Sequence, residues 1–265
     1  RYAVIEERSI PGRDARFGPI PSALQEEVRN AISTGVKGLY LHQSKAITSF
    51  LEGNDICLAT STASGKSLVF MACATDLLFR DPLAKCIVLY PAKALIMDQL
   101  SRWKEWAEPY GLKIGYIHGE VATRDRLSLL LSSRVLLMTP DVAHAWLMSH
   151  LSDNRIHRFM EHLRLVVLDE AHVYEGVFGS NMAYFMRRLS AVARNHRLIM
   201  TTATIGNPCD FSYLLTGRNV VSFSKEDDSS YIATKHVLVV TESDADTFQC
   251  KVDLLRKLRD RKDGR

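Results

Sequence analysis

From residue 56 onward, two kinds of segment alternate along the chain, and this alternation constrains the fold more than any other feature. Short apolar runs rich in β-branched residues recur, and a stretch of helix length follows each of them. The predicted strands are 56–59, 86–90, 114–117, 135–138, 165–168 and 198–200, and the segments with helical spacing are 66–80, 92–107, 121–131, 140–150 and 180–194. Such alternation is typical of βαβ units with right-handed crossovers, and the nearly continuous apolar character of the runs indicates burial on both faces. We therefore predict an α/β fold with a central, mainly parallel sheet and helices on both faces.

The two ends of the chain are less regular. Residues 1–21 hold three prolines, two glycines and no sustained period, which predicts an irregular strap. Ser22 is the predicted N-cap of a short helix that ends near Thr34. Toward the C-terminus we predict a helix over 207–217, strands over 220–223 and 236–240, and a charged, solvated helix over 246–262. The predicted domains are a strap with a helix (1–38), a central domain (39–240) and a charged C-terminal helix (241–265).

Composition excludes several classes of protein. Hydrophobic residues make up 46% and charged residues 24% of the chain, which is typical of globular domains. No apolar run approaches the ~18 residues of a membrane helix, so no membrane partner is expected. The five cysteines are scattered without a Cys-x-x-Cys pair, which favours a reducing, intracellular location over a disulfide framework or a zinc site. That location would be the nucleus in a eukaryote or the cytoplasm in a bacterium. The net charge of +4 permits nucleic-acid binding without indicating it.

A turn suited to phosphate follows the first strand of the alternation. Residues 60–67 read Thr-Ser-Thr-Ala-Ser-Gly-Lys-Ser and open an apolar helix, which is the pattern of a P-loop. Backbone N–H groups of Thr62, Ala63, Ser64 and Gly65, helped by the helix dipole, could hold the phosphates of ATP. Lys66 would reach the β- and γ-phosphates, and the Ser67 hydroxyl would bind Mg²⁺. Thr60 replaces the first glycine of the usual pattern, and an ordinary helix start is the alternative interpretation.

A pair of acids follows the strand over 165–168, in the sequence Asp169-Glu170-Ala171-His172. Two carboxylates would be costly inside a buried sheet, so they are expected to face the crevice beyond the strand ends. There Asp169 can hold Mg²⁺, mostly through water, and Glu170 can orient and deprotonate an attacking water. Lys66, Asp169 and Glu170 are the predicted catalytic residues. The alternative is that the two acids only cap the next loop.

The order of further motifs resembles that of the superfamily-two DEAH-box helicases. The resemblance implies that Gln43 reads the adenine edge. The loops after three predicted strands resemble motifs that grip the phosphates of one nucleic-acid strand without reading sequence: Pro91, Ala92, Lys93, His118, Gly119, Thr139, Pro140 and Asp141. The segment Thr202-Ala203-Thr204 resembles the motif that links hydrolysis to movement, and His172 is implied to act with it. Each motif alone could be only a helix start or a cap.

Four segments narrow the resemblance: 39–43, 62–67, 174–180 and 204–208. They are similar to the bacterial mitomycin-repair helicase and its RecQ-like fungal and plant relatives. The resemblance implies a RecA-like ATP-binding domain over residues 39–240, a single-stranded or partly duplex DNA substrate, 3′-to-5′ translocation and a role in DNA repair or genome maintenance. Bacterial antiviral defence is an alternative pathway.

The resemblance also implies a partner domain. Members of the family need a second RecA-like domain whose arginines complete the ATP site, and no Gln-x-x-Gly-Arg-x-Gly-Arg pattern follows Thr204. Because the chain starts at Arg1 and not at Met, we expect an upstream part to have been removed. The resemblance implies that the second domain belongs to the same full-length chain. We expect these 265 residues alone to bind ATP and Mg²⁺ weakly and to be nearly inactive. The alternatives are an RNA helicase, a non-catalytic nucleic-acid-binding module, and a P-loop kinase, which would leave the motifs at 91–95 and 202–204 unexplained.

Overall fold

The computed structural model describes residues 2–242, 251–252 and 256. The chain forms two compact units. The first consists of residues 16–229, and the second of residues 1–15 together with the chain from residue 230 onward. Helix α1 (Glu26–Gly35) belongs to the first unit, where it contacts α3 (Lys66–Arg80). The predicted domain boundaries at residues 38 and 240 stay predictions.

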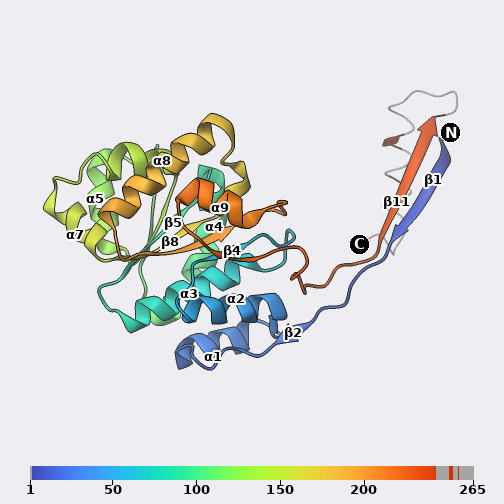
Figure 1. Ribbon diagram of the computed structural model, residues 1–265, viewed down its shortest axis with the longest axis horizontal. Helices are drawn as coiled ribbons and strands as arrows, with labels where there is room; N and C mark the ends of the chain where they lie inside the picture. Colours follow the sequence, from blue (N-terminus) through green and yellow to red (C-terminus); the bar gives the residue numbers. More distant parts are fainter. Residues whose placement is uncertain (1, 243–250, 253–255, 257–265) are drawn as a thin grey trace. The chain divides into compact units, whose positions relative to one another are not determined.

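A seven-stranded sheet forms the centre of the first unit (Figure 1). Its strand order is β10-β4-β9-β8-β5-β7-β6, and every neighbouring pair is parallel. The strands are β4 (Ile56–Leu58), β5 (Lys85–Leu89), β6 (Ile114–Ile117), β7 (Val135–Met138), β8 (Leu163–Leu168), β9 (Arg197–Thr201) and β10 (Val221–Phe223). The predicted parallel sheet is therefore confirmed.

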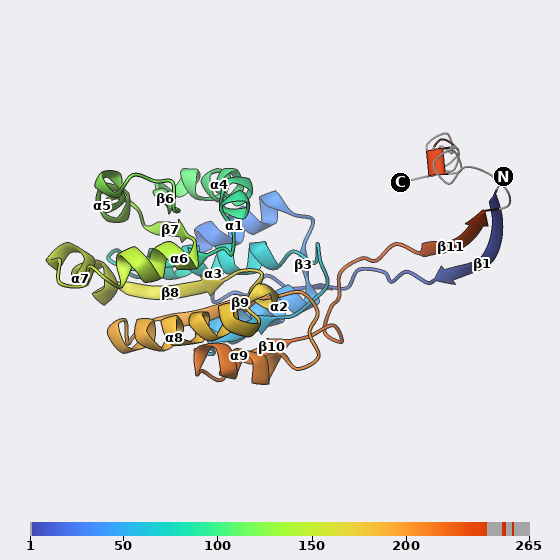
Figure 2. The ribbon, with the colours of Figure 1, turned by 90° about the horizontal axis from the view of Figure 1, so that it is seen from above.

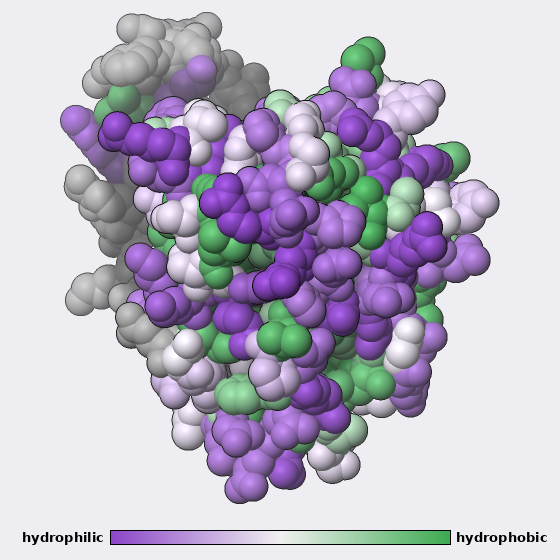
Figure 3. All heavy atoms as spheres, turned by 90° about the vertical axis from the view of Figure 1, so that its left-hand side faces the viewer, coloured by the Kyte–Doolittle hydropathy of each residue, from purple (hydrophilic) through white to green (hydrophobic). Residues whose placement is uncertain are grey.

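Helices cover both faces of this sheet. They are α1, α2 (Leu41–Leu51), α3, α4 (Lys93–Ala107), α5 (Thr123–Ser132), α6 (Pro140–Val142), α7 (Asn154–Glu161), α8 (Gly176–Val192) and α9 (Pro208–Thr216), with short turns at Glu108–Tyr110 and Ala171–Val173 and a π-helical turn at Ala143–Leu147. Figure 2 shows α3 and α8 on opposite sides of β8. The end that carries α5 and α7 is mostly hydrophilic, with small separate hydrophobic patches (Figure 3).

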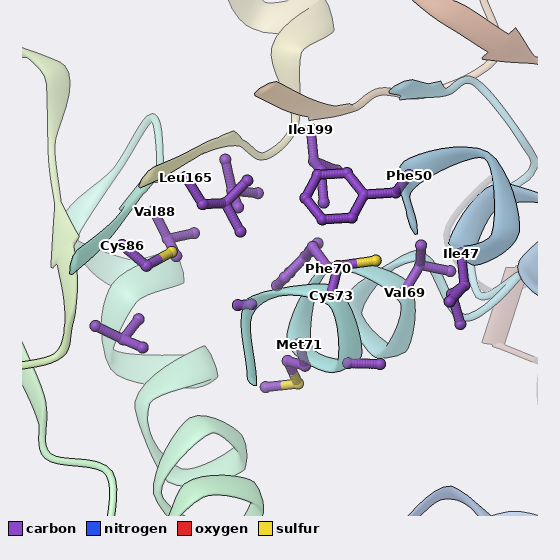
Figure 4. Packing of buried hydrophobic residues seen from close by; sticks show 14 of the residues in the cluster. Ile47, Phe50, Val69, Phe70, Met71, Cys73, Cys86, Val88, Leu165 and Ile199 are labelled. Atoms are coloured by element: carbon purple, nitrogen blue, oxygen red, sulfur yellow. The ribbon is translucent and has the colours of Figure 1, made fainter. Parts of the chain in front are cut away.

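Two apolar cores lie on the two faces, and alternate strand residues enter them. In β8, Leu165 and Val167 point into the core under α1–α4, whereas Val166 and Leu168 point into the core under α5–α9. Figure 4 shows Phe70 of α3 in the first core, with side chains from α2 and the strands around it. Burying one such side chain contributes about 1.5–3 kcal/mol, so the double-sided sheet is what fixes the positions of the loops at its edge.

The second unit contains an antiparallel pair, β1 (Tyr2–Ile10) with β11 (Lys235–Glu242). The predicted irregular strap is therefore wrong for residues 2–10, because the partner of this strand lies at the other end of the sequence. A second short pair, β2 (Phe17–Gly18) with β3 (Leu39–Tyr40), was also not predicted.

Three further expectations concern helices. The first helix begins at Glu26, four residues after the predicted cap at Ser22. The predicted helix over 246–262 lies outside the described residues except at Lys251, Val252 and Arg256, which are helical. Within the described part of the chain, no helix has the length and apolar character needed to cross a membrane.

Candidate functional site

The loop between β4 and α3 has a backbone that only a few residues tolerate. Gly65 has φ +79° and Ala63 has φ 61°. The positive φ favours glycine at residue 65, and a side chain there would also displace the amide nitrogen Nε2 of Gln43. At residue 60, where the usual pattern has glycine, the Thr60 hydroxyl lies 2.7 Å from the Ser64 hydroxyl, and both residues are buried. This bond ties the two ends of the loop together.

The Lys66 amine is held inside this loop. Its Nζ donates to the carbonyl oxygens of Thr60 and Ser61, each at 3.0 Å. Burial lowers the pKa of Lys66, while the nearby carboxylates of Glu170 and Asp169 act to raise it. The first N–H groups of α3 also have no partner inside the helix. A cation and the N-terminal N–H groups of α3 therefore meet at one point, which is what phosphate requires.

Asp169 follows β8 and remains buried, with 8% of its surface exposed. Its Oδ1 accepts from the Glu170 N–H at 3.0 Å and from the Thr201 hydroxyl. Burial raises the pKa of Asp169, whereas the Thr201 hydrogen bond lowers it. A buried carboxylate of this kind gains from a nearby cation.

The donor set fits Mg²⁺ better than a metal that needs a protein cage. Among the described residues, no group of three or more His, Cys, Asp or Glu could hold a metal ion. Mg²⁺ characteristically binds one or two protein oxygens and completes its shell with phosphate oxygens and waters. The Asp169 carboxylate and the Ser67 hydroxyl, at the start of α3, could supply those protein oxygens.

Glu170 is connected to the loop after β9 through a histidine. It has a left-handed backbone conformation, with φ 51° and ψ 43°, which is uncommon for a residue with a side chain. Its carboxylate lies 3.3 Å from Nδ1 of His172, and that nitrogen also lies 3.3 Å from the Ala203 N–H. When protonated, Nδ1 donates to Glu170, and when unprotonated it accepts from Ala203. His172 therefore bridges the acid motif and the segment 202–204.

Within that segment, Thr202 is fully buried and its N–H donates to the Leu58 carbonyl at 3.0 Å, whereas Thr204 is exposed. Among the described residues, the Thr202 hydroxyl has no hydrogen-bond partner. The three residues thus differ in what they can contact.

Gln43 lies in the first turn of α2 and is almost completely buried. Its Oε1 accepts from the Tyr40 N–H at 2.8 Å, and its Nε2 donates to the Gly65 carbonyl at 2.9 Å. The side chain therefore supports the loop directly. Its contact with adenine stays a prediction.

A further buried group holds the loop, and the sequence did not reveal it. The Ser61 N–H donates to the Asp228 carboxylate at 3.1 Å. His42 accepts at Nδ1 from the Ser229 N–H at 3.2 Å, which leaves its Nε2 to donate to the Ser64 carbonyl at 3.1 Å. The segment at 228–229 follows β10 and belongs to no motif, so only its tertiary contacts identify it. We call Asp228, Ser229 and His42 the loop clamp.

The predicted nucleic-acid residues follow β5, β6 and β7 and therefore lie at the same edge of the sheet as the loop, since the strands are parallel. Lys93 forms an ion pair with Glu120, which lowers the pKa of that glutamate. His118 is buried, and its Nδ1 accepts from the Glu120 N–H at 3.3 Å. Thr139 and Pro140 are also buried. The structure places these loops together, and their contact with nucleic acid stays a prediction.

Comparison with known proteins agrees with this geometry. Residues 40–211 match the DEAD/DEAH box helicase family. The chain is 32% identical to the ATP-dependent helicase HRQ1 of Saccharomyces cerevisiae over 87% of its length and 22% of that protein. It is 31% identical to the uncharacterized ATP-dependent helicase YprA of Bacillus subtilis over 81% of its length and 29% of that protein.

Among solved structures, the chain resembles the DUF1998 helicase MrfA bound to DNA. The TM-score is 0.87 and the sequence identity is 28%, over 96% of this chain and 37% of that one. The chain thus spans less than half the length of each of these three proteins.

Proposed function

Since the chain belongs to the DEAD/DEAH box helicase family, we propose that it is the ATP- and Mg²⁺-binding first RecA-like domain of a DNA helicase or translocase. One observation carries this proposal: the Lys66 amine, after β4, and the Asp169 and Glu170 carboxylates, after β8, meet at one edge of the parallel sheet. Both carboxylates are close enough to act on the pKa of the amine. We also propose that the protein acts inside the cell, in the nucleus of a eukaryote or the cytoplasm of a bacterium.

The chemistry follows from what each side chain can hold. Lys66 would exchange the carbonyl oxygens of Thr60 and Ser61 for the β- and γ-phosphates, with the loop N–H groups contacting the same phosphates. Ser67 and Asp169 would hold Mg²⁺, which when bound neutralises charge on the phosphates. Glu170 would orient the attacking water and take its proton.

Coupling to movement would run through His172. Because its Nδ1 lies 3.3 Å from both Glu170 and the Ala203 N–H, a change at the acid motif alters which of the two it binds. The segment Thr202–Thr204 would pass this change toward the loops that contain Lys93, His118 and Thr139. Their backbone groups would hold one strand of single-stranded or partly duplex DNA through its phosphates.

The similarity to MrfA, whose structure holds DNA, favours DNA over RNA as the substrate. The resemblance implies 3′-to-5′ movement in DNA repair. We propose that residues 39–240 form the RecA-like domain and that residues 241–265 lead toward a second one in the full-length chain. The second domain would supply the arginine that is worth roughly 10³–10⁵ in turnover in other phosphoryl-transfer enzymes. The 265 residues alone should therefore turn over ATP very slowly.

The test is ATP turnover by the full-length protein, with and without DNA and RNA single strands of matched length. We expect stimulation by DNA, and a loss of about 10²–10⁴ in turnover on Glu170→Gln with ATP binding preserved. Glu175→Gln is the matched control, because Glu175 is an exposed carboxylate on the same segment. Unchanged turnover in Glu170→Gln would remove Glu170 as the base. Stimulation by RNA alone would indicate an RNA motor, and ATP binding without stimulation would indicate a binding module.

A further inference from the structure

A cavity of about 380 Å³ opens beside the predicted nucleic-acid loops, between residues 140–145 and the N-terminal half of α8. Its volume is within the range of ligand sites, about 300–1,000 Å³. The side chains that matter most for its chemistry are Asp141, His144, Phe178, Asn181, Tyr184 and Phe185. The function proposed above does not use this cavity, although Pro140 and Asp141 at its rim are predicted to contact nucleic-acid phosphates.

The lining combines flat apolar surfaces with a few hydrogen-bonding groups. Phe185 is buried and lies against His144, with ring centroids 6.3 Å apart. Phe178 and Tyr184 are 37% and 70% exposed. Asn181 can donate and accept hydrogen bonds, and Asp141 can accept them. Among the described residues that line the cavity, none is Lys or Arg. These groups suit a flat, uncharged ring with polar edges, and they do not suit a phosphate.

The side chains of α8 that line the cavity have a regular spacing. Phe178, Asn181 and Phe185 follow one another at three and four positions along α8, so they share the helix face that borders the cavity. Val177, which is 80% exposed, adds apolar surface to the same end of the helix. Single exposed apolar residues are ordinary, whereas exposed aromatic residues that line a cavity together, as Phe178 and Tyr184 do, are typical of a binding surface. The opposite wall includes part of the π-helical turn at Ala143–Leu147, a feature frequent at functional sites.

The identity of the occupant follows from continuity with the proposed nucleic-acid path. Pro140 and Asp141 line the cavity and also belong to the loop that we expect to hold strand phosphates. A strand held by its phosphates at residues 139–141 would turn its bases away from those contacts and toward the neighbouring surface. Bases of single strands stack readily on aromatic side chains, and every base offers a flat face for this.

We propose that this cavity takes one unpaired nucleobase of the bound strand, stacked on Phe178 and Tyr184 and contacted at its edge by Asn181 and Asp141. The proposal rests on the function proposed above. The contact holds the strand by a base without demanding a particular sequence, because stacking carries most of the interaction.

The experiment is an abasic scan of DNA binding by the full-length protein. The probe is a fluorescent single-stranded oligothymidylate, used intact and in versions that each lack one base at successive positions. In the wild-type protein we expect one position at which removal of the base weakens binding by about 5- to 150-fold, which corresponds to about 1–3 kcal/mol of base–aromatic stacking. In Tyr184→Ala the intact probe should bind more weakly, and that position should lose most of its sensitivity.

Two features separate this contact from a general effect. The dependence of affinity on salt should be unchanged in Tyr184→Ala, because no phosphate contact is lost. Tyr213→Ala is the matched control, since Tyr213 is 54% exposed on α9 and does not line the cavity; its abasic scan should equal that of the wild type. Tyr184 is itself so exposed that its truncation should not unfold the protein.

The outcomes distinguish this proposal from the one on which it rests. Failure of the wild-type protein to bind the intact probe would overturn the proposed function, and this inference with it. Firm binding with equal affinity for all abasic probes would overturn the base cavity alone. A position that stays sensitive in Tyr184→Ala, or a reduced salt dependence in that variant, would also overturn it.

Discussion

The loop clamp can be tested by replacing Asp228 with alanine. The Asp228 carboxylate accepts from the Ser61 N–H at 3.1 Å and is completely buried next to His42. Its removal leaves a partly buried N–H without this acceptor at the point where the loop must keep its shape. Asp227→Ala is the matched control. Asp227 is an exposed acid next in sequence that accepts within its own turn, from the Ser224 N–H at 3.0 Å and from the Ser224 hydroxyl.

The magnitude follows from the kind of bond that is lost. A hydrogen bond to a charged acceptor contributes about 1.5–3 kcal/mol. If the whole of this were needed to keep the loop competent, the affinity for ATP would fall by about 10- to 150-fold, at about 1.4 kcal/mol for each factor of ten. The loop will relax in the variant, so part of the loss will appear as a lower unfolding temperature instead. We expect an increase of about tenfold or more in the Kd for ATP.

The assay is a titration with a fluorescent ATP analogue in the presence of Mg²⁺, paired with thermal unfolding without nucleotide. Asp228→Ala should bind the analogue more weakly and unfold at a lower temperature, whereas Asp227→Ala should match the wild type in both measurements. Wild-type affinity in Asp228→Ala would refute the idea that the clamp holds the loop for nucleotide.

Three further predictions follow from individual side chains. Burial raises the pKa of Asp169, so its charge opposes folding as the pH rises through that pKa. Asp169→Asn should therefore raise the unfolding temperature at neutral pH without Mg²⁺ and remove the effect of Mg²⁺ on nucleotide affinity. A lower unfolding temperature would contradict this. Thr60→Gly restores the usual P-loop glycine but deletes the hydrogen bond to Ser64. This variant should have a free energy of unfolding in urea that is lower by about 1–2 kcal/mol. Unchanged stability would show that the bond contributes nothing. Burial lowers the pKa of His196 below 6.5, so the unfolded state binds more protons and stability should fall as the pH falls through about 6.5. In His196→Gln, the free energy of unfolding in urea should depend less on pH between about pH 7.5 and about pH 5.5. An equally steep loss of stability would contradict the assignment.

The strands were predictable because burial on both faces leaves a continuous apolar run in the sequence. In β8 every residue from Leu165 to Leu168 is buried. The end of α9 was predictable for a local reason, since Gly217 takes a left-handed conformation there, with φ 73°. Features of this kind depend on neighbours in the sequence.

The features that sequence did not reveal depend on distant partners. Strand β1 pairs with β11 from the other end of the chain, and Asp228 reaches Ser61 from a polar turn that resembles an ordinary surface loop. Helix α7 buries Ile156, Phe159 and Met160, but it is short and strongly charged, so the sequence alone does not indicate it. The parallel sheet is confirmed, whereas the roles of the individual site residues stay predictions.

The most direct test of the account is Mg²⁺-dependent binding of ATP by the protein with and without the Lys66 amine. Lys45→Ala serves as the control, because Lys45 is an exposed lysine on α2. The account predicts that the wild type and Lys45→Ala bind a fluorescent ATP analogue more tightly with Mg²⁺ than without it, and that Lys66→Ala loses the binding. Equal binding by Lys66→Ala would contradict the assignment of the loop as the phosphate site.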